Sequence, residues 1–358
     1  MKKLLVVLFA VVILAIALAG CGRRGPSVPD KKPAATEAPV VQPTATPAPT
    51  ERPTPRANPT LATVPRSADH WAELMQKGVD KFGADNPGVT AFLKAPAKAD
   101  GASQSAIVED LLAQNVDALC VVPDSVEALD PIFKKAGESG IKIVTNEGYA
   151  AKNADLDIEA FDNSAYGTHL MDALARRMGE EGEYAVFVGN LNAAAENQWA
   201  DAAMAWQKQR YPKMTLVAGK IETGDDPQKA YAQVKALLEA HPNLKGFESN
   251  GWMDAAGIGM AIQEAGIQDK TVAVGTSFVS TAGKYLSSGA VDMIAFWDPA
   301  AVAYACNRLA LILFNGETPI EGMDLGLPGY DKLQQKDKVF YGEAWIDVTK
   351  DNMAKYNY

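Results

Sequence analysis

The sequence predicts an α/β fold of two lobes, each a parallel sheet flanked by helices. Three observations predict it: strand-like and helix-like segments alternate from residue 61 onward, several strands are continuous apolar runs, and polar or turn residues follow most of them. A run that is apolar throughout is typical of a strand buried on both faces. About ten strands in this length of chain favour two sheets rather than one.

The clearest unit is the strand–helix–strand segment 117–147. Residues 118–122 and 141–145 predict buried strands, and Asp130-Pro131 predicts the start of the helix between them, which Gly140 ends. In a parallel sheet the residues just past each strand meet at one edge, so we expect binding chemistry there. The polar residues at these strand ends are Asp124, Ser125, Asn146 and Glu147.

The segments before this unit predict two more strands and two more helices. The strands are 61–64 and 89–93, and 65–71 is the loop after the first of them. The helices are 71–82 and 107–112.

The segments after it continue the alternation. A short strand leads through 160–167 into a helix that ends at Met178, and Asp226-Pro227 and Asp298-Pro299 each predict a helix start. The remaining predicted strands are 184–188, 215–218, one that ends at Phe247, 272–275 and 291–296. The remaining predicted helices are 198–210, 255–265 and one from Asp298 to Phe314.

Composition excludes several classes of function. The net charge of −10 and the pI near 5.0 argue against a nucleic-acid partner. Three cysteines at Cys21, Cys120 and Cys306 supply neither a disulfide framework nor a paired-cysteine metal site, and the three histidines are far apart. We therefore expect no metal and no cofactor, and we interpret Cys120 and Cys306 as small core residues.

The N-terminal segment predicts export and anchoring. Two lysines precede the apolar run 4–17, which is too short for an ordinary membrane span. The run ends in L-A-G-C, which resembles the bacterial lipobox, where the signal is cut before a cysteine that then receives lipid. We expect a signal peptide over 1–20 and a lipidated Cys21 that tethers the protein outside the cytoplasmic membrane. The alternative is an ordinary signal peptide that contains a cysteine.

A spacer is expected over 21–60, between the anchor and the folded part. This segment is rich in Pro, Thr and Ala, and such a composition favours extended, unpacked chain.

Several segments of the folded part share one order and spacing: D-A-L-C-V-V-P-D, G-I-K-I-V-T-N-E, F-D-N-S-A-Y-G, A-H-P-N-L-K-G-F, G-I-G-M-A-I-Q-E-A-G and A-F-W-D-P-A. In these segments the chain resembles the type I periplasmic sugar-binding proteins of ABC importers. E-N-Q-W, F-W-D and the C-terminal I-D-V-T-K-D-N-M-A-K-Y-N-Y are most similar to the rhamnose-binding and autoinducer-2-binding branch. The resemblance covers about 61–358.

The resemblance implies two lobes joined by three chain crossings, with ligand in the cleft between them. It places 61–161 plus 299–325 in the N-terminal lobe and 162–298 plus 326–358 in the C-terminal lobe. It also implies capture of a small sugar or polyol, delivery to an ABC permease, a monomeric state and no enzymatic activity. A neutral ligand is expected because both signs of charge line the predicted cleft without a dedicated carboxylate clamp.

The chain departs from the autoinducer-2 type of pocket, for which the resemblance implies a lysine, two aspartates and a glutamine. The positions that match are Arg66, Glu147, Ala195 and Glu196. The first two keep the charge type, whereas an alanine side chain forms no hydrogen bond. This puts autoinducer-2 itself in doubt as the ligand.

Polar and aromatic side chains at strand ends are the candidate ligand contacts. An arginine offers a fork of donors to hydroxyl or carbonyl oxygens, and a carboxylate accepts from two hydroxyls. Tryptophan faces stack on the C–H faces of sugars and exclude water. The predicted ligand-binding residues are Arg66, Asp69, His70, Trp71, Asn146, Glu147, Glu196, Asn197, Asn250, Trp252, Asp254, Trp297 and Asp298.

Structural alternatives stand beside these assignments. Arg66 also suits a salt bridge between lobes, Glu147 a solvated turn, and Asp254 a helix cap. Each tryptophan also suits a core position, Trp199 and Trp206 have the spacing of a core stripe, and Asn163 is interpreted as a helix cap. We predict structural roles for Asp124 and Asn163.

Two other classes of protein remain open at this point. Glu147 and Glu196 could serve as a glycosidase pair, although no catalytic motif stands at a strand–helix junction. A receptor domain that presents its closed form to a membrane kinase would have the same sequence features.

Overall fold

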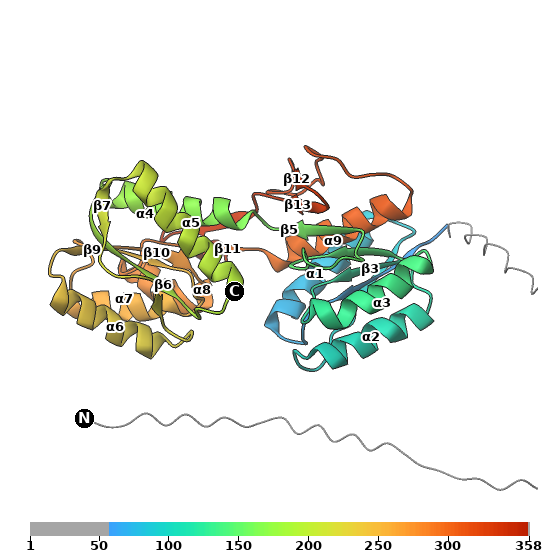
Figure 1. The fold of residues 1–358 in the computed structure, drawn as a ribbon, viewed down its shortest axis with the longest axis horizontal. Helices are drawn as coiled ribbons and strands as arrows, with labels where there is room; N and C mark the ends of the chain where they lie inside the picture. Colours follow the sequence, from blue (N-terminus) through green and yellow to red (C-terminus); the bar gives the residue numbers. More distant parts are fainter. Residues whose placement is uncertain (1–56, 357–358) are drawn as a thin grey trace, which may run out of the picture. The chain divides into compact units, whose positions relative to one another are not determined.

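The computed structural model describes residues 57–356, so the predicted signal peptide, Cys21 and nearly all of the spacer lie outside the described residues. The described residues form two sheets (Figure 1). We call each sheet with its helices a lobe. The expected α/β fold, with two mainly parallel sheets flanked by helices, is confirmed.

The first lobe is built on seven strands in the order β12-β13-β5-β4-β3-β1-β2, all parallel to their neighbours except β12. These strands are β1 (Thr60–Val64), β2 (Thr90–Leu93), β3 (Ala118–Val121), β4 (Lys142–Thr145), β5 (Leu156–Glu159), β12 (Gln334–Lys336) and β13 (Val339–Tyr341). Its helices are α1 (His70–Asp85), α2 (Gly101–Ala113), α3 (Val126–Glu138) and α9 (Pro299–Phe314).

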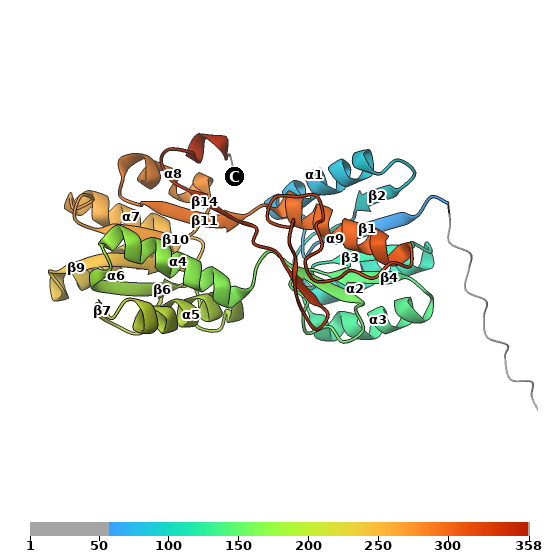
Figure 2. The same ribbon diagram turned by 90° about the horizontal axis from the view of Figure 1, so that it is seen from above.

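Alternate residues of the first sheet face different helices. Leu61 and Cys120 pack in the core with α1 and α9, whereas Ala62 and Leu119 pack with α2 and α3 on the other face (Figure 2). Side chains two apart on a strand share a face, so a run that is apolar throughout fills both cores.

The second lobe has the order β14-β11-β10-β9-β6-β7, with β8 also paired to β6 and β14 antiparallel to β11. Its strands are β6 (Glu181–Val188), β7 (Lys213–Leu216), β8 (Ile221–Glu222), β9 (Leu244–Ser249), β10 (Val272–Thr276), β11 (Met293–Trp297) and β14 (Trp345–Val348). Its helices are α4 (Asn163–Met178), α5 (Ala194–Arg210), α6 (Pro227–Ala240), α7 (Asp254–Ala265), α8 (Val279–Ser288) and the short 3₁₀ helix η1 (Met353–Lys355).

The second sheet is likewise covered on both faces. Tyr184 and Val186 pack with α4 and α5, and Phe187 and Phe247 pack with α6, α7 and α8 (Figure 1). In the described part of the chain no helix is long and apolar enough to cross a bilayer.

Two predicted helix starts are wrong. Ser125, not Asp130, caps α3, because its side chain accepts from the Ala128 amide while the Asp130 carboxylate is bonded to Asn153. Pro131 therefore lies inside the helix. Asp162, one residue before Asn163, caps α4 by accepting from the Ala165 amide.

The C-terminal tail does not belong wholly to the second lobe, contrary to the expectation for 326–358. β13 pairs with β5 of the first sheet, and Val339 and Phe340 are buried there. Only β14 and η1 join the second lobe. The chain therefore passes between the lobes for the third time near 341–345, between β13 and β14, and not at Leu325. The sequence could not show this, because short strands without an intervening helix carry no crossover pattern.

Candidate functional site

The candidate site is a cavity of about 570 Å³ lined by residues of both lobes. Most of these residues follow the carboxyl ends of parallel strands, where ligands of α/β sheets bind. The first lobe contributes Pro65, Arg66, Ser67, Asp69, Trp71, Val122, Asn146, Glu147, Tyr149, Glu159, Ala160 and Phe161. The second contributes Asn163, Ala193, Ala194, Ala195, Glu196, Gln198, Trp199, Trp252, Phe278 and Trp297.

Most of the predicted site residues come together in this cavity. They are Arg66, Asp69, Trp71, Asn146, Glu147, Glu196, Trp252 and Trp297. Their contact with a ligand stays a prediction.

The other predicted residues do not line it. His70 is exposed and contacts Glu73, and Asn197 donates to the backbone carbonyls of Asn190 and Ala193. Asp298 caps α9 by accepting from the Ala300 amide.

Two more predicted residues are buried inside the second lobe. Asn250 donates to the Phe187 carbonyl at 3.0 Å. Asp254 begins α7 and accepts from the Thr223 hydroxyl at 2.5 Å and the Gly251 amide at 3.2 Å. These bonds hold the loops after β8 and β9, and the loop after β9 carries Trp252 to the cavity wall.

Sequence reasoning missed several cavity residues. Phe278 and Glu159 stand at strand ends, which is the signal that could have identified them. Trp199 is packed in the core, as its spacing from Trp206 predicts, and it also faces the cavity. Asn163 lines the cavity, accepts from Trp199 Nε1 at 2.7 Å and donates to Gln198 at 2.8 Å.

An ion pair stands at the first-lobe wall. Arg66 Nη2 lies 2.8 Å from a carboxylate oxygen of Glu147, and Arg66 Nε donates to the Pro123 carbonyl at 3.0 Å. The pair is within the first lobe, so it is not the bridge between lobes that the sequence left open. Glu147 has φ of +56°, a conformation that costs about 1–3 kcal/mol and often marks binding sites.

Two carboxyl groups of β5 lie near this pair. Asp157 is buried and accepts from the Thr145 hydroxyl at 2.6 Å and the Gly148 amide at 3.0 Å. Burial, and then the neighbouring Asp157 and Glu147, raise the pKa of Glu159 well above its ordinary value. Burial raises the pKa of Asp157 above its ordinary value as well.

Glu196 is the acidic residue on the second-lobe wall. It lies in the first turn of α5 and accepts from the Gly189 amide at 2.8 Å and the Asn190 amide at 3.2 Å. Burial, and to a smaller extent the charges of Asp225 and Asp254, raise its pKa to about 7. Its carboxyl group thus fixes the loop that leads into Ala193, Ala194 and Ala195.

Aromatic rings make up the rest of the wall. Trp71 of the first lobe lies 5.6 Å from Trp297 and 6.3 Å from Trp252, measured between ring centroids. Trp252 is stacked on Phe278 at 4.7 Å. Such a surface binds C–H groups or a cation and keeps water out.

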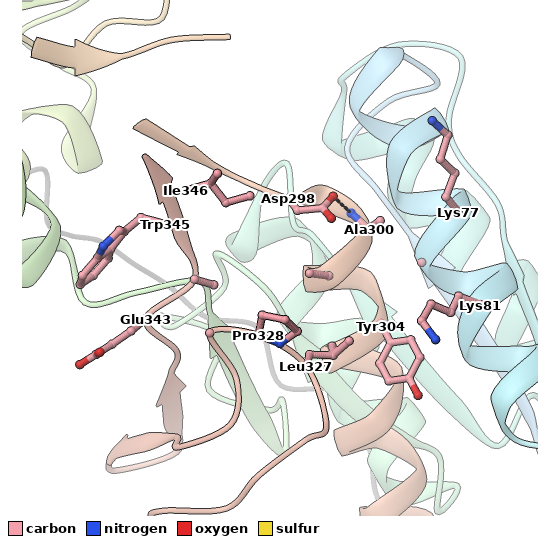
Figure 3. A pocket seen from close by; sticks show the side chains of 14 residues that line it. Lys77, Lys81, Asp298, Ala300, Tyr304, Leu327, Pro328, Glu343, Trp345 and Ile346 are labelled. Carbon is pink, nitrogen blue, oxygen red and sulfur yellow. Dashed lines mark hydrogen bonds between the residues drawn. The ribbon is translucent and has the colours of Figure 1, made fainter. Parts of the chain in front are cut away.

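A second cavity, of about 460 Å³, lies beside the third passage between lobes (Figure 3). Its polar side chains do not converge: Lys77 and Glu343 lie at opposite sides of the view, and Asp298 is bonded to the Ala300 amide. Tyr304 donates to Asp85, a residue outside the cavity lining. The first cavity is therefore the better candidate.

Within residues 57–356, no group of three or more His, Cys, Asp or Glu side chains is arranged to hold a metal ion.

Comparison with known proteins identifies the family. The model of the periplasmic binding protein domain matches residues 61–318. The chain is 27% identical to the D-ribose/D-allose-binding protein of Pseudomonas aeruginosa, over 62% of this chain and 70% of that protein. It is 29% identical to the D-allose-binding periplasmic protein of Escherichia coli, over 65% of this chain and 76% of that protein.

Solved structures show the same fold. A sugar ABC transporter protein from Actinomyces odontolyticus aligns with a TM-score of 0.77 at 21% identity, over 84% of this chain and 98% of that one. A solute-binding protein from Clostridium phytofermentas with bound L-rhamnose aligns with a TM-score of 0.62 at 19% identity, over 84% and 98%. The proteins of this family act outside the cytoplasm and bind substrates without converting them. The chain belongs to the periplasmic binding protein family, among the type I sugar-binding proteins of ABC transporters.

Proposed function

We propose that this protein is a lipid-anchored, extracytoplasmic binding protein that captures a small sugar or polyol and delivers it to an ABC importer. The observation that carries the proposal is the cavity at the strand ends of both lobes, with four tryptophans and polar groups in its wall. Relatives that bind ribose, allose and xylose support the choice of a sugar.

The wall suits a ligand with hydroxyl groups on an apolar ring. Trp252 and Trp297 offer faces to C–H groups, while Arg66 and Glu147 offer donors and acceptors to hydroxyls. The glycosidase alternative is weaker, because Glu147 is paired with Arg66 and Glu196 is bonded to backbone amides. Both carboxyl groups thus hold the site in shape.

The proposed mechanism is closure of two lobes around the ligand. The chain passes between the sheets near 159–163, 297–299 and 341–345, and these segments would act as the hinge. Trp71 and Glu147 belong to one lobe, and Trp252 and Glu196 to the other. A ligand gains all contacts only when the lobes meet, so binding shifts the open–closed balance toward the closed form.

The anchor is proposed from the sequence alone. Cys21 follows a short apolar segment in the L-A-G-C pattern, and the Pro- and Thr-rich spacer would hold the lobes away from the bilayer.

A thermal-shift screen of the purified 57–358 segment tests the proposal. Pentoses, hexoses, deoxysugars, amino sugars, polyols and autoinducer-2 would be added one at a time. At a hundred times its Kd, a ligand stabilises the native state by about 2.7 kcal/mol. We expect at least one sugar or polyol to raise the Tm by several degrees. Stabilisation by amino acids or peptides, with none by any sugar or polyol, would overturn the proposal.

A further inference from the structure

The first-lobe wall of the cavity contains a hydrogen-bond acceptor that the protein leaves unused. Asn146 lines the cavity and is only 2% exposed. Its Nδ2 donates to the Ile158 carbonyl at 2.7 Å, but its Oδ1 has no partner among the described residues. A buried acceptor without a donor costs about 1–3 kcal/mol, so a donor from a ligand would relieve it.

Acidic residues outnumber basic ones around that acceptor. Among the described residues that line the cavity, Asp69, Glu147, Glu159 and Glu196 are acidic and Arg66 is the only basic one. Arg66 is already occupied by Glu147 and the Pro123 carbonyl. Among the described residues, neither Glu159 nor Glu196 forms a direct ion pair, although Arg66 lies near Glu159.

The aromatic wall is compatible with a positive charge. Trp71, Trp252 and Trp297 all line the same cavity, and the negative faces of such rings attract ammonium groups. Aromatic rings alone do not distinguish a cation from a C–H face. The excess of carboxyl groups over basic groups among the lining residues favours the cation.

We propose that the ligand carries a protonated amine on a sugar or polyol scaffold, and that Asn146 Oδ1 and Glu159 receive its ammonium group. The inference rests on the proposed sugar- or polyol-binding function and replaces the neutral ligand that the sequence led us to expect. A charged hydrogen bond to a carboxylate is stronger than a neutral one, and an ammonium group donates three.

The proposal predicts that binding of the amine releases a proton from Glu159. Glu159 faces Asp157, Glu147 and Arg66, with Tyr330 and Tyr341 nearby, and its pKa is raised above its ordinary value chiefly by burial. An ammonium beside it favours the ionised carboxylate. Binding then breaks the Glu159 O–H bond and releases the proton to the buffer, without any change of redox state.

Sugars that differ only at the amine test the proposed preference for a protonated amino sugar. D-Glucosamine, D-galactosamine and D-mannosamine would be compared at pH 7 with their parent hexoses and their N-acetyl derivatives by calorimetry. We expect at least one amine to bind at least tenfold more tightly than both of its uncharged counterparts. Equal or tighter binding of the uncharged sugars would overturn the inference and leave the proposed function standing. If no sugar, amino sugar or polyol binds in either screen, the proposed function fails and the inference fails with it.

Calorimetric titrations of the amine in phosphate and in Tris test whether binding releases a proton. These buffers have different enthalpies of ionisation, so release of a proton makes the observed binding enthalpy differ between them. Equal enthalpies would contradict the proposed role of Glu159.

A matched pair of variants tests whether Glu159 receives the ammonium group. Glu159→Gln keeps the size of the side chain but cannot ionise, so the preference for the amine should fall at least tenfold and the buffer dependence should vanish. Glu138→Gln, at the exposed end of α3, should keep both. A Glu159→Gln protein that folds and retains the amine preference would also overturn the inference.

Discussion

The polar residues of the cavity are held in place by partners inside the protein. Arg66 is fixed by the Glu147 carboxylate and the Pro123 carbonyl, and Glu196 by two backbone amides. Side chains that are ordered before binding lose less conformational entropy when a ligand arrives. At the residue scale, the site is therefore arranged in advance of its ligand.

Removing either member of the Arg66–Glu147 pair should weaken binding. Arg66→Ala and Glu147→Ala each leave ligand hydroxyls and the surviving charge without a partner, which costs roughly 1–3 kcal/mol. We expect at least a tenfold rise in the Kd of the ligand found in the screen, measured by calorimetry. Glu109→Ala and Lys135→Ala, which break an exposed pair on α2 and α3, serve as controls. Unchanged affinity in both cavity variants would contradict the assignment.

A buried glutamate should make stability depend on pH. Glu248 lies fully buried in β9, and burial, followed by the charge of Asp254, raises its pKa to about 8 from an ordinary 4.5. Its contribution is most favourable below pH 4.5, where the carboxyl group is protonated in both states. It is lost progressively as the pH rises from about 4.5 to about 8, because the unfolded chain ionises this carboxyl group while the folded protein keeps it protonated.

We expect the free energy of unfolding to fall between pH 6 and pH 9 in urea titrations. In Glu248→Gln this fall should be smaller by about 1 kcal/mol or more, since each unit of pKa shift corresponds to about 1.4 kcal/mol. Glu138→Gln should keep the wild-type dependence. A Glu248→Gln protein with the full wild-type fall would show that another group is responsible.

At the scale of secondary structure, the first lobe depends on the close contact of α1 with α9. Gly78 of α1 faces the N-terminal turn of α9, where an added Cβ would lie 1.9 Å from the Ala300 carbonyl oxygen. No side chain fits that space unless the helices separate. The glycine therefore sets the distance between α1, which carries Trp71, and α9, which follows directly after Trp297.

Gly78→Ala should destabilise the protein by about 1–3 kcal/mol, the usual cost of overpacking. Gly137→Ala is the matched control, because Gly137 lies in α3 with nothing within 4 Å of an added Cβ. There the substitution should stabilise by about 0.5–1 kcal/mol through higher helix propensity. Denaturant unfolding measures both, and equal effects of the two substitutions would contradict the proposed contact.

At the scale of the whole molecule, binding is expected to bring the lobes together. The cavity takes residues from both lobes, and aromatic contacts such as Trp71–Trp252 join them. Ligand should decrease the radius of gyration measured by X-ray scattering and should change tryptophan emission at the same concentrations. A tight ligand that moves neither signal would rule out closure.

The anchor is tested in cells. In a bacterial host that lipidates exported proteins, the full chain should fractionate with membranes, because the lipid on Cys21 holds it there. Cys21→Ser should release the protein or leave it unprocessed. If the variant fractionates and migrates as the wild type does, Cys21 is not lipidated.

Much of the fold could be predicted because its signals are local. Apolar runs predicted the strands around 118–122 and 141–145, and Asp298-Pro299 predicted the start of α9 correctly. The strand-end rule also placed Arg66, Glu147 and Trp252 at the cavity. The same local signals gave a wrong helix start for α3, because Ser125 and Asp130 are both suitable capping residues and the helix begins after the first of them.

By itself, the sequence determined the α/β class, the division into two sheets and the strand ends at which binding chemistry gathers. Only the tertiary structure decided that β13 joins β5, that Glu159 lines the cavity near the Arg66–Glu147 pair, and that Phe278 stacks on Trp252. The physical reason is distance along the chain. Periodicity and caps act over a few residues, whereas these contacts join segments whose approach depends on the packing of both lobes.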